Sequence, residues 1–138
     1  MKSLLHRFLR DRRAELDEAA FVLPVLILVS VAIVNLAMLG TAALSAGNAA
    51  NYGARMGSVA VENQAAVAAS AASQAIDAAR VGEYAVNVTG GGQPGTIITV
   101  SINFSVPNYF GGLARLFGAS APDNFTGLTQ SYFRQEGW

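Results

Sequence analysis

One apolar stretch, Ala19 to Gly40, constrains this chain more than any other feature. It is 22 residues long and contains no Asp, Glu, Lys, Arg or His, and its hydrogen-bonding side chains are Ser30 and Asn35. A helix of that length rises roughly 33 Å, close to the ~30 Å hydrocarbon core of a bilayer. A buried core helix is the alternative, but a chain of 138 residues has little other material to cover such a stretch. We therefore predict a membrane-spanning helix over residues 19–40.

The charges are distributed unevenly around this stretch. Residues 1–13 carry five cations and one anion, although the whole chain is neutral. Basic residues beside one end of a membrane span keep that end in the cytoplasm. We therefore predict a cytoplasmic leader over 1–18 and export of residues 41–138. A cleaved signal peptide remains an alternative because small residues follow Gly40, but the apolar core of a signal peptide is usually only ~7–15 residues long.

Residues 41–82 form an Ala-rich tract, and Ala is the strongest helix former. We expect this tract to continue the first helix as far as a C-cap at Gly82. Gly53 and Gly57 lie four residues apart, and small residues at this spacing let helix backbones approach closely. A helix continuous to Val81 is too long for a small domain to cover. We expect it to pack against other copies of the chain, with a simple helical spacer as the alternative.

Residues 83–138 change to the pattern of a small exported β domain. EYAVNV (83–88) and TIITVSINFSV (96–106) alternate with period two on either side of the turn sequence TGGGQPG. This pattern predicts a hairpin, and FTGLTQSYFRQ (125–135) predicts a third strand, with a short helical turn expected around 113–117. The expected fold class is α+β, with a long N-terminal helix followed by a small three-stranded antiparallel sheet.

The residue inventory disfavours catalysis, cofactor binding and metal binding. The chain has no Cys, and its one His lies in the basic leader, so no nucleophile and base can be paired. The acidic residues do not cluster as a cation cage, and the exported part carries no basic stripe for nucleic acid. We expect no enzyme activity, no cofactor, no metal and no nucleic-acid partner. Asn-x-Ser/Thr triplets, which are candidate glycosylation sites or ordinary strand sequence, begin at Asn87, Asn103 and Asn124.

Two residues stand out beside and within the apolar stretch. Glu18 directly precedes it, and a carboxylate at the membrane boundary is costly unless it is paired, so Glu18 is a candidate functional group. The alternative role of Glu18 is a favourable interaction with the helix dipole. Pro24 cannot donate a hydrogen bond to the carbonyl of Ala20, so we expect the helix to be weakened or bent there.

The string from Glu18 to Leu26, EAAFVLPVL, resembles the start of TadE-like pseudopilins of the tight-adherence (Tad) type IV pilus systems. That family typically shows a Glu, an apolar run and a Pro six residues after the Glu. The resemblance implies a major or minor pilin-like structural subunit that waits in the inner membrane. The pilus assembly machinery would then extract it into an extracellular helical filament of many copies. The helices would form the filament core, and the β domains would form its surface.

The resemblance also implies roles for the two residues. Glu18 would compensate a positive group on a neighbouring subunit, and Pro24 would mark where the helix loosens on extraction. Prepilin peptidase usually cuts such chains after a Gly five residues before the Glu, but Arg13 occupies that place here. We therefore expect an uncleaved or atypically processed subunit in which Glu18 pairs with Arg13 or a nearby arginine of an adjacent copy. The alternative is a single-pass membrane-anchored protein whose outer β domain binds a partner.

Overall fold

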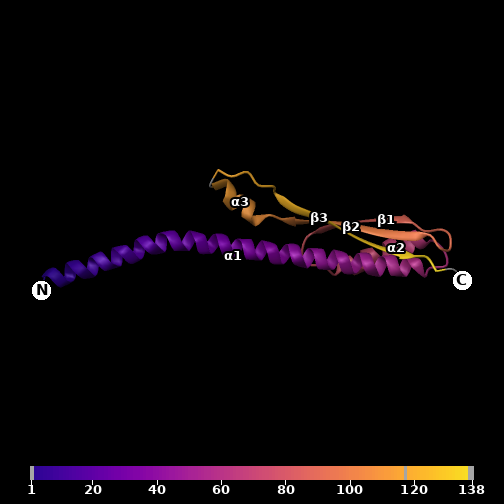
Figure 1. The fold of residues 1–138 in the computed structure, drawn as a ribbon, viewed down its shortest axis with the longest axis horizontal. Helices are drawn as coiled ribbons and strands as arrows, with labels where there is room; N and C mark the ends of the chain where they lie inside the picture. Colours follow the sequence, from indigo (N-terminus) through magenta and orange to yellow (C-terminus); the bar gives the residue numbers. More distant parts are fainter. Residues whose placement is uncertain (1, 117, 137–138) are drawn as a thin grey trace. The chain divides into compact units, whose positions relative to one another are not determined.

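The computed structural model describes the backbone of residues 2–116 and 118–136, and the side chains of residues 20, 22–115 and 118–136. Its elements, labelled in Figure 1, are α1 (Lys2–Ser58), α2 (Gln64–Asp77), β1 (Glu83–Gly90), β2 (Ile97–Pro107), α3 (Tyr109–Leu116) and β3 (Asn124–Arg134). The predicted α+β fold class is confirmed, since a long N-terminal helix precedes a three-stranded antiparallel sheet. The chain divides into two compact units, residues 1–34 and 35–138, and the division falls inside α1.

The sheet of the second unit has the strand order β1-β2-β3, and both pairs are antiparallel. Glu83 lies opposite Ser105 in the first pair, and the second pair runs without a bulge from Ile97 opposite Arg134 to the other end of β2. Every second side chain of β2 points into the core, and this inward row consists of Ile98, Val100, Ile102, Phe104 and Val106. The predicted strands are therefore present, because the period-two pattern places five apolar side chains of β2 on one face, whereas Ile97 at its start is 57% exposed.

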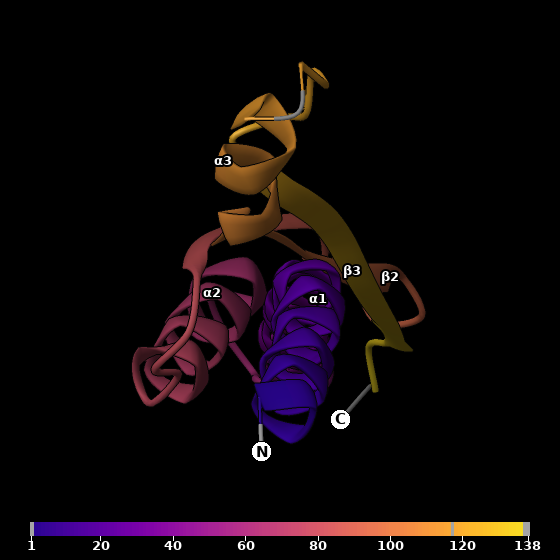
Figure 2. The ribbon, with the colours of Figure 1, turned by 90° about the vertical axis from the view of Figure 1, so that its left-hand side faces the viewer.

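Helices α1 and α2 cover this inward face. Figure 2 shows the two helices side by side, with the strands on one side of the pair. Their contribution to the core is mostly alanine, and it consists of Ala42, Ala46, Ala49, Ala50, Ala54, Ala68, Ala72 and Ile76. Because alanine side chains are short, the helices approach both the sheet and each other closely. The second unit is thus a two-layer domain with one continuous core.

The expectation of one unbroken helix through the Ala-rich tract is wrong. Helix α1 ends at Ser58, and α2 begins at Gln64 after a turn in which Asn63 adopts a left-handed conformation with φ 52°. The two helices run antiparallel, because Gly57 faces the start of α2 whereas Gly53 faces residues further along it. The tract from 41 to 82 therefore covers itself within one chain. Gly82, expected as a helix C-cap, instead precedes β1, since α2 ends at Asp77.

Candidate functional site

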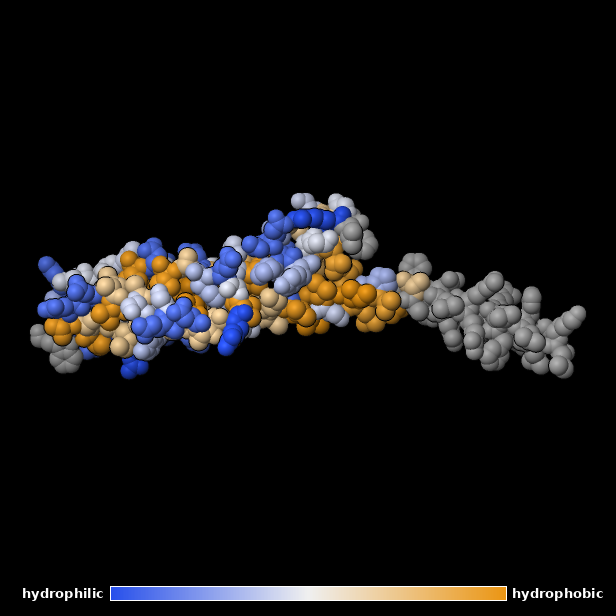
Figure 3. Space-filling model, turned by 180° about the vertical axis from the view of Figure 1, so that it is seen from behind, coloured by the Kyte–Doolittle hydropathy of each residue, from blue (hydrophilic) through white to orange (hydrophobic). Residues whose placement is uncertain are grey.

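The described part of α1 before Asn35 is an exposed apolar helix. Eight of its large side chains are 49–61% exposed, and they are Val22, Leu23, Val25, Leu26, Ile27, Val29, Ile33 and Val34, whereas Leu28 and Val31 are partly buried. Figure 3 shows hydrophobic residues, in orange, along this part of α1 on the face seen there. Successive residues lie about 100° apart around a helix, so this run is apolar on every side. The helix is long and apolar enough to cross a membrane.

The polar atoms of this segment do not require water. Ser30 donates a hydrogen bond of 2.7 Å from its Oγ to the carbonyl oxygen of Leu26, one turn earlier. Pro24 lies within the segment, and α1 continues through it as an α-helix. The backbone of Glu18 and Arg13 is part of α1, but the structure does not describe their side chains. The exposed apolar segment, residues 22–34, is the first part of the candidate site.

Asn35, which follows the exposed segment, is only 4% exposed, although Leu36 beyond it is 69% exposed. The Nδ2 of Asn35 donates a hydrogen bond of 3.1 Å to the Oδ1 of Asn108, just before α3. Asn108 in turn donates to the carbonyl oxygen of Pro122 at 2.8 Å and accepts a 3.0 Å bond from the amide of Gly111. The Oδ1 of Asn35 has no hydrogen-bond partner among the described residues. This network ties α1, α3 and the loop before β3 together at one point.

Helix α3 lies at the end of the sheet where β2 ends and β3 begins (Figure 1). Tyr109 is 56% exposed and Phe110 is 37% exposed, whereas Gly111 is buried against Asn108. At the other end of α3, Arg115 forms an ion pair with Asp123. Helix α3 is therefore held to the domain through Gly111 and Asn108, and its first two residues are exposed aromatics. The ion pair at its other end adds no net charge.

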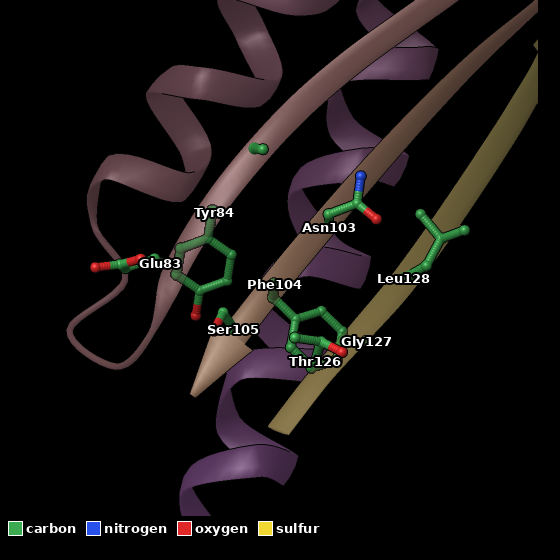
Figure 4. Close-up of a pocket in the computed structure, with 9 residues that line it drawn as sticks. Glu83, Tyr84, Asn103, Phe104, Ser105, Thr126, Gly127 and Leu128 are labelled. Carbon is green, nitrogen blue, oxygen red and sulfur yellow. The ribbon is translucent and has the colours of Figure 1, made fainter. Parts of the chain in front are cut away.

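The outward face of the sheet carries a shallow groove of about 570 Å³ at one end. Figure 4 shows residues of β1, β2 and β3 that line it. Two cross-strand rows form its walls: Glu83, Ser105 and Thr126 in one row, and Ala85, Asn103 and Leu128 in the other. Between them, Phe104 turns inward and covers Gly127, where a Cβ would lie 2.2 Å from its ring. The ionisable side chains lining the groove are Glu83 and Tyr84, and the hydroxyl of Tyr84 donates a hydrogen bond to the carbonyl oxygen of Val81.

The remaining predicted residues fall on two surfaces. Asn87, Asn103 and Asn124 are exposed on the outward face of the sheet. Gly53 and Gly57 are buried against α2 of the same chain rather than against another copy. The Asn35–Asn108 bond was not predicted, and the one available signal was an amide inside an otherwise apolar stretch.

No group of three His, Cys, Asp or Glu residues able to hold a metal ion occurs among the described residues. No family model, curated protein or solved structure matches this chain. The TadE-like resemblance therefore remains a prediction that depends on Glu18, Pro24 and the apolar run between them. The structure shows exposed apolar side chains over residues 22–34 of α1 and a buried bond from Asn35 to Asn108, the residue before α3.

Proposed function

We propose that this protein is a structural subunit of an extracellular type IV pilus-like filament, of the TadE-like kind, that is anchored in the inner membrane before assembly. The observation that carries the proposal is the exposed apolar segment, residues 22–34, which is followed in the same helix by a part that the chain covers itself. The first part requires an external apolar environment, and the second does not.

The energetics favour two alternative environments for the exposed segment. Fully burying one large aliphatic side chain contributes ~1.5–3 kcal/mol, so the eight half-exposed side chains represent a further contribution on the order of 10 kcal/mol. Lipid or like helices can supply this burial. Lipid tails are as apolar as Leu, so transfer between the two environments has little net hydrophobic cost. A segment whose only described polar side chain, Ser30, bonds its own helix can make that transfer without losing hydrogen bonds.

Because α2 packs on α1 of the same chain, fewer residues remain for the proposed packing between copies. Residues 41–82 are covered within one chain, so the filament core is proposed to consist of residues 19–40 alone. Within it, Glu18 is proposed to pair with a cation such as Arg13 of a neighbouring copy, and Pro24 to loosen the helix on extraction. The exposed segment equally suits a permanent membrane anchor with a partner-binding outer domain, which is the second candidate function.

Cysteine cross-linking separates the two candidate functions, because the native chain has no cysteine. Single substitutions Val25→Cys, Leu26→Cys, Ile27→Cys and Leu28→Cys lie about 100° apart around the helix and so sample all its sides. For a filament subunit we expect oxidised dimers in material sheared from the cell surface. Ser58→Cys is the matched control, because Ser58 is buried and a cysteine there has no access to another copy. Confinement of the chain to the membrane fraction would reject the filament and favour the anchor.

A second experiment tests the proposed charge pairing. Glu18→Ala removes the carboxylate, and Glu18→Gln keeps its size but removes its charge. Because an unpaired cation inside an apolar helix bundle is costly, both variants are expected to give fewer surface filaments by electron microscopy. Filament numbers equal to wild type in both variants would eliminate the proposed role of Glu18.

A further inference from the structure

Helix α3 is fixed to α1 at a defined level. The bond between Asn35 and Asn108, buried at both ends, sets which turn of α1 the start of α3 lies beside. The predicted membrane span ends at Gly40, five residues after Asn35. At ~1.5 Å per residue this separation is roughly 7.5 Å along the helix. Helices that lie in a membrane interface are buried to a depth of ~5–10 Å. The start of α3 therefore lies at the depth expected of a helix at the boundary between the outer headgroups and the acyl chains.

The exposed end of α3 has the chemistry of that region. Tyr109 and Phe110 are exposed although both are aromatic, and they adjoin the residue that carries the buried bond. Tyrosine is enriched at membrane–water interfaces because its ring is apolar and its hydroxyl remains hydrated. The charged side chains at the far end of α3, Arg115 and Asp123, pair with each other. This pairing lowers the cost of bringing α3 near lipid.

From these observations we propose that α3 docks on the outer leaflet of the membrane, with Tyr109 and Phe110 inserted among the lipid headgroups. The inference rests on the membrane-anchored stage of the proposed function. The docked helix holds the exported domain against the bilayer, in addition to the anchor that α1 provides. The Asn35–Asn108 bond acts as a positioning contact, because it sets the depth at which the two aromatic rings meet the lipid.

Spin labelling of the full chain tests this docking. Single cysteines at Tyr109 and Phe110 are labelled with a nitroxide, and the protein is reconstituted at low density in phosphatidylethanolamine–phosphatidylglycerol vesicles. Collision with oxygen, which partitions into lipid, is compared with collision with a water-soluble nickel complex. We expect labels at both positions to be several-fold less accessible to nickel than a label at Tyr132, which is 71% exposed on the outward face of β3.

A label at Ile27 distinguishes the possible failures. If Ile27 lies in lipid but the labels at Tyr109 and Phe110 collide with nickel as often as the label at Tyr132, the docking is wrong and the membrane anchor stands. If Ile27 itself is accessible to nickel, the membrane-anchored stage fails and the docking fails with it. Labels at 109 and 110 shielded from both oxygen and nickel, with dipolar broadening, would mean contact with a second copy and would also reject docking on lipid.

Discussion

Helix α1 has an exposed half, residues 22–34, and a covered half, residues 35–58. Between these halves the usual relation between side-chain size and burial is reversed. The exposed half carries Val, Leu and Ile, whereas the covered half buries little but Ala. In a water-soluble helix the large apolar side chains form the buried face. Here the large side chains lie where the chain supplies no cover, and the small ones lie where a second helix and a sheet approach closely. The first half is therefore long and apolar enough to span a membrane, whereas the small side chains of the second half allow close packing against the same chain.

The strongest test of this contrast places a charge in the exposed half. Val29→Asp lies near the middle of the predicted span, where an aspartate costs ~2.5–3.5 kcal/mol. We expect less of the chain to remain in the membrane pellet after an alkaline wash than for wild type. The matched change is Leu44→Asp, at a position that is 70% exposed but beyond the predicted span, where no loss is expected. Retention of Val29→Asp at the wild-type level would mean that lipid does not surround the exposed half.

Two glycines test the covered half in the same way. A Cβ at Gly53 would lie 2.7 Å from the carbonyl oxygen of Ala68 and from the Cβ of Ala72, whereas a Cβ at Gly40 meets nothing within 4 Å. Gly53→Ala is therefore expected to lower the free energy of unfolding by ~1–3 kcal/mol. Gly40→Ala is expected to raise it by up to ~1 kcal/mol through helix propensity. Thermal melts in detergent followed by circular dichroism measure both. A higher melting temperature for Gly53→Ala would contradict the packing of α2 on α1.

The sequence predicted the sheet better than it predicted the helical layer, for a physical reason. The strands alternate strictly, and a one-residue slip would expose the row from Ile98 to Val106, so the pattern alone determines them. The end of α1 has no such signal. No proline interrupts residues 58–64, and the turn depends on contacts between Gly53, Gly57 and α2 that form only in the folded chain. The bond between Asn35 and Asn108 spans 73 positions, beyond the reach of any local pattern.

The third test concerns the boundary between the two halves, where Asn35 and Asn108 meet. Asn35 makes one side-chain hydrogen bond there, whereas Asn108 makes three. Asn35→Ala removes one hydrogen bond and leaves Asn108 bonded to Gly111 and Pro122, so we expect a loss of ~0.5–1.5 kcal/mol. Asn108→Ala removes three side-chain hydrogen bonds, while the amide of Gly111 keeps its 3.2 Å bond to the backbone carbonyl oxygen of residue 108, and the change is expected to cost ~1–3 kcal/mol. Hydrogen exchange at the amide of Gly111 measures the difference. Equal exchange rates in the two variants would show that Asn108 does not organise this junction.

The smallest expected effect compares one serine from each half. The Oγ of Ser58 donates a 2.8 Å bond to the carbonyl oxygen of Arg55 in the covered half, and Ser30 makes the equivalent bond in the exposed half. Ser58→Ala loses a bond worth ~0.5–1.5 kcal/mol, partly offset by the higher helix propensity of Ala, so a net loss below ~1 kcal/mol is expected. Ser30→Ala removes donor and bond together from a helix in an apolar environment, and no measurable change in melting temperature is expected. If Ser30→Ala were the more damaging change, the hydroxyl of Ser30 would have to bond to a neighbouring helix, and contacts between copies would then be polar as well as apolar.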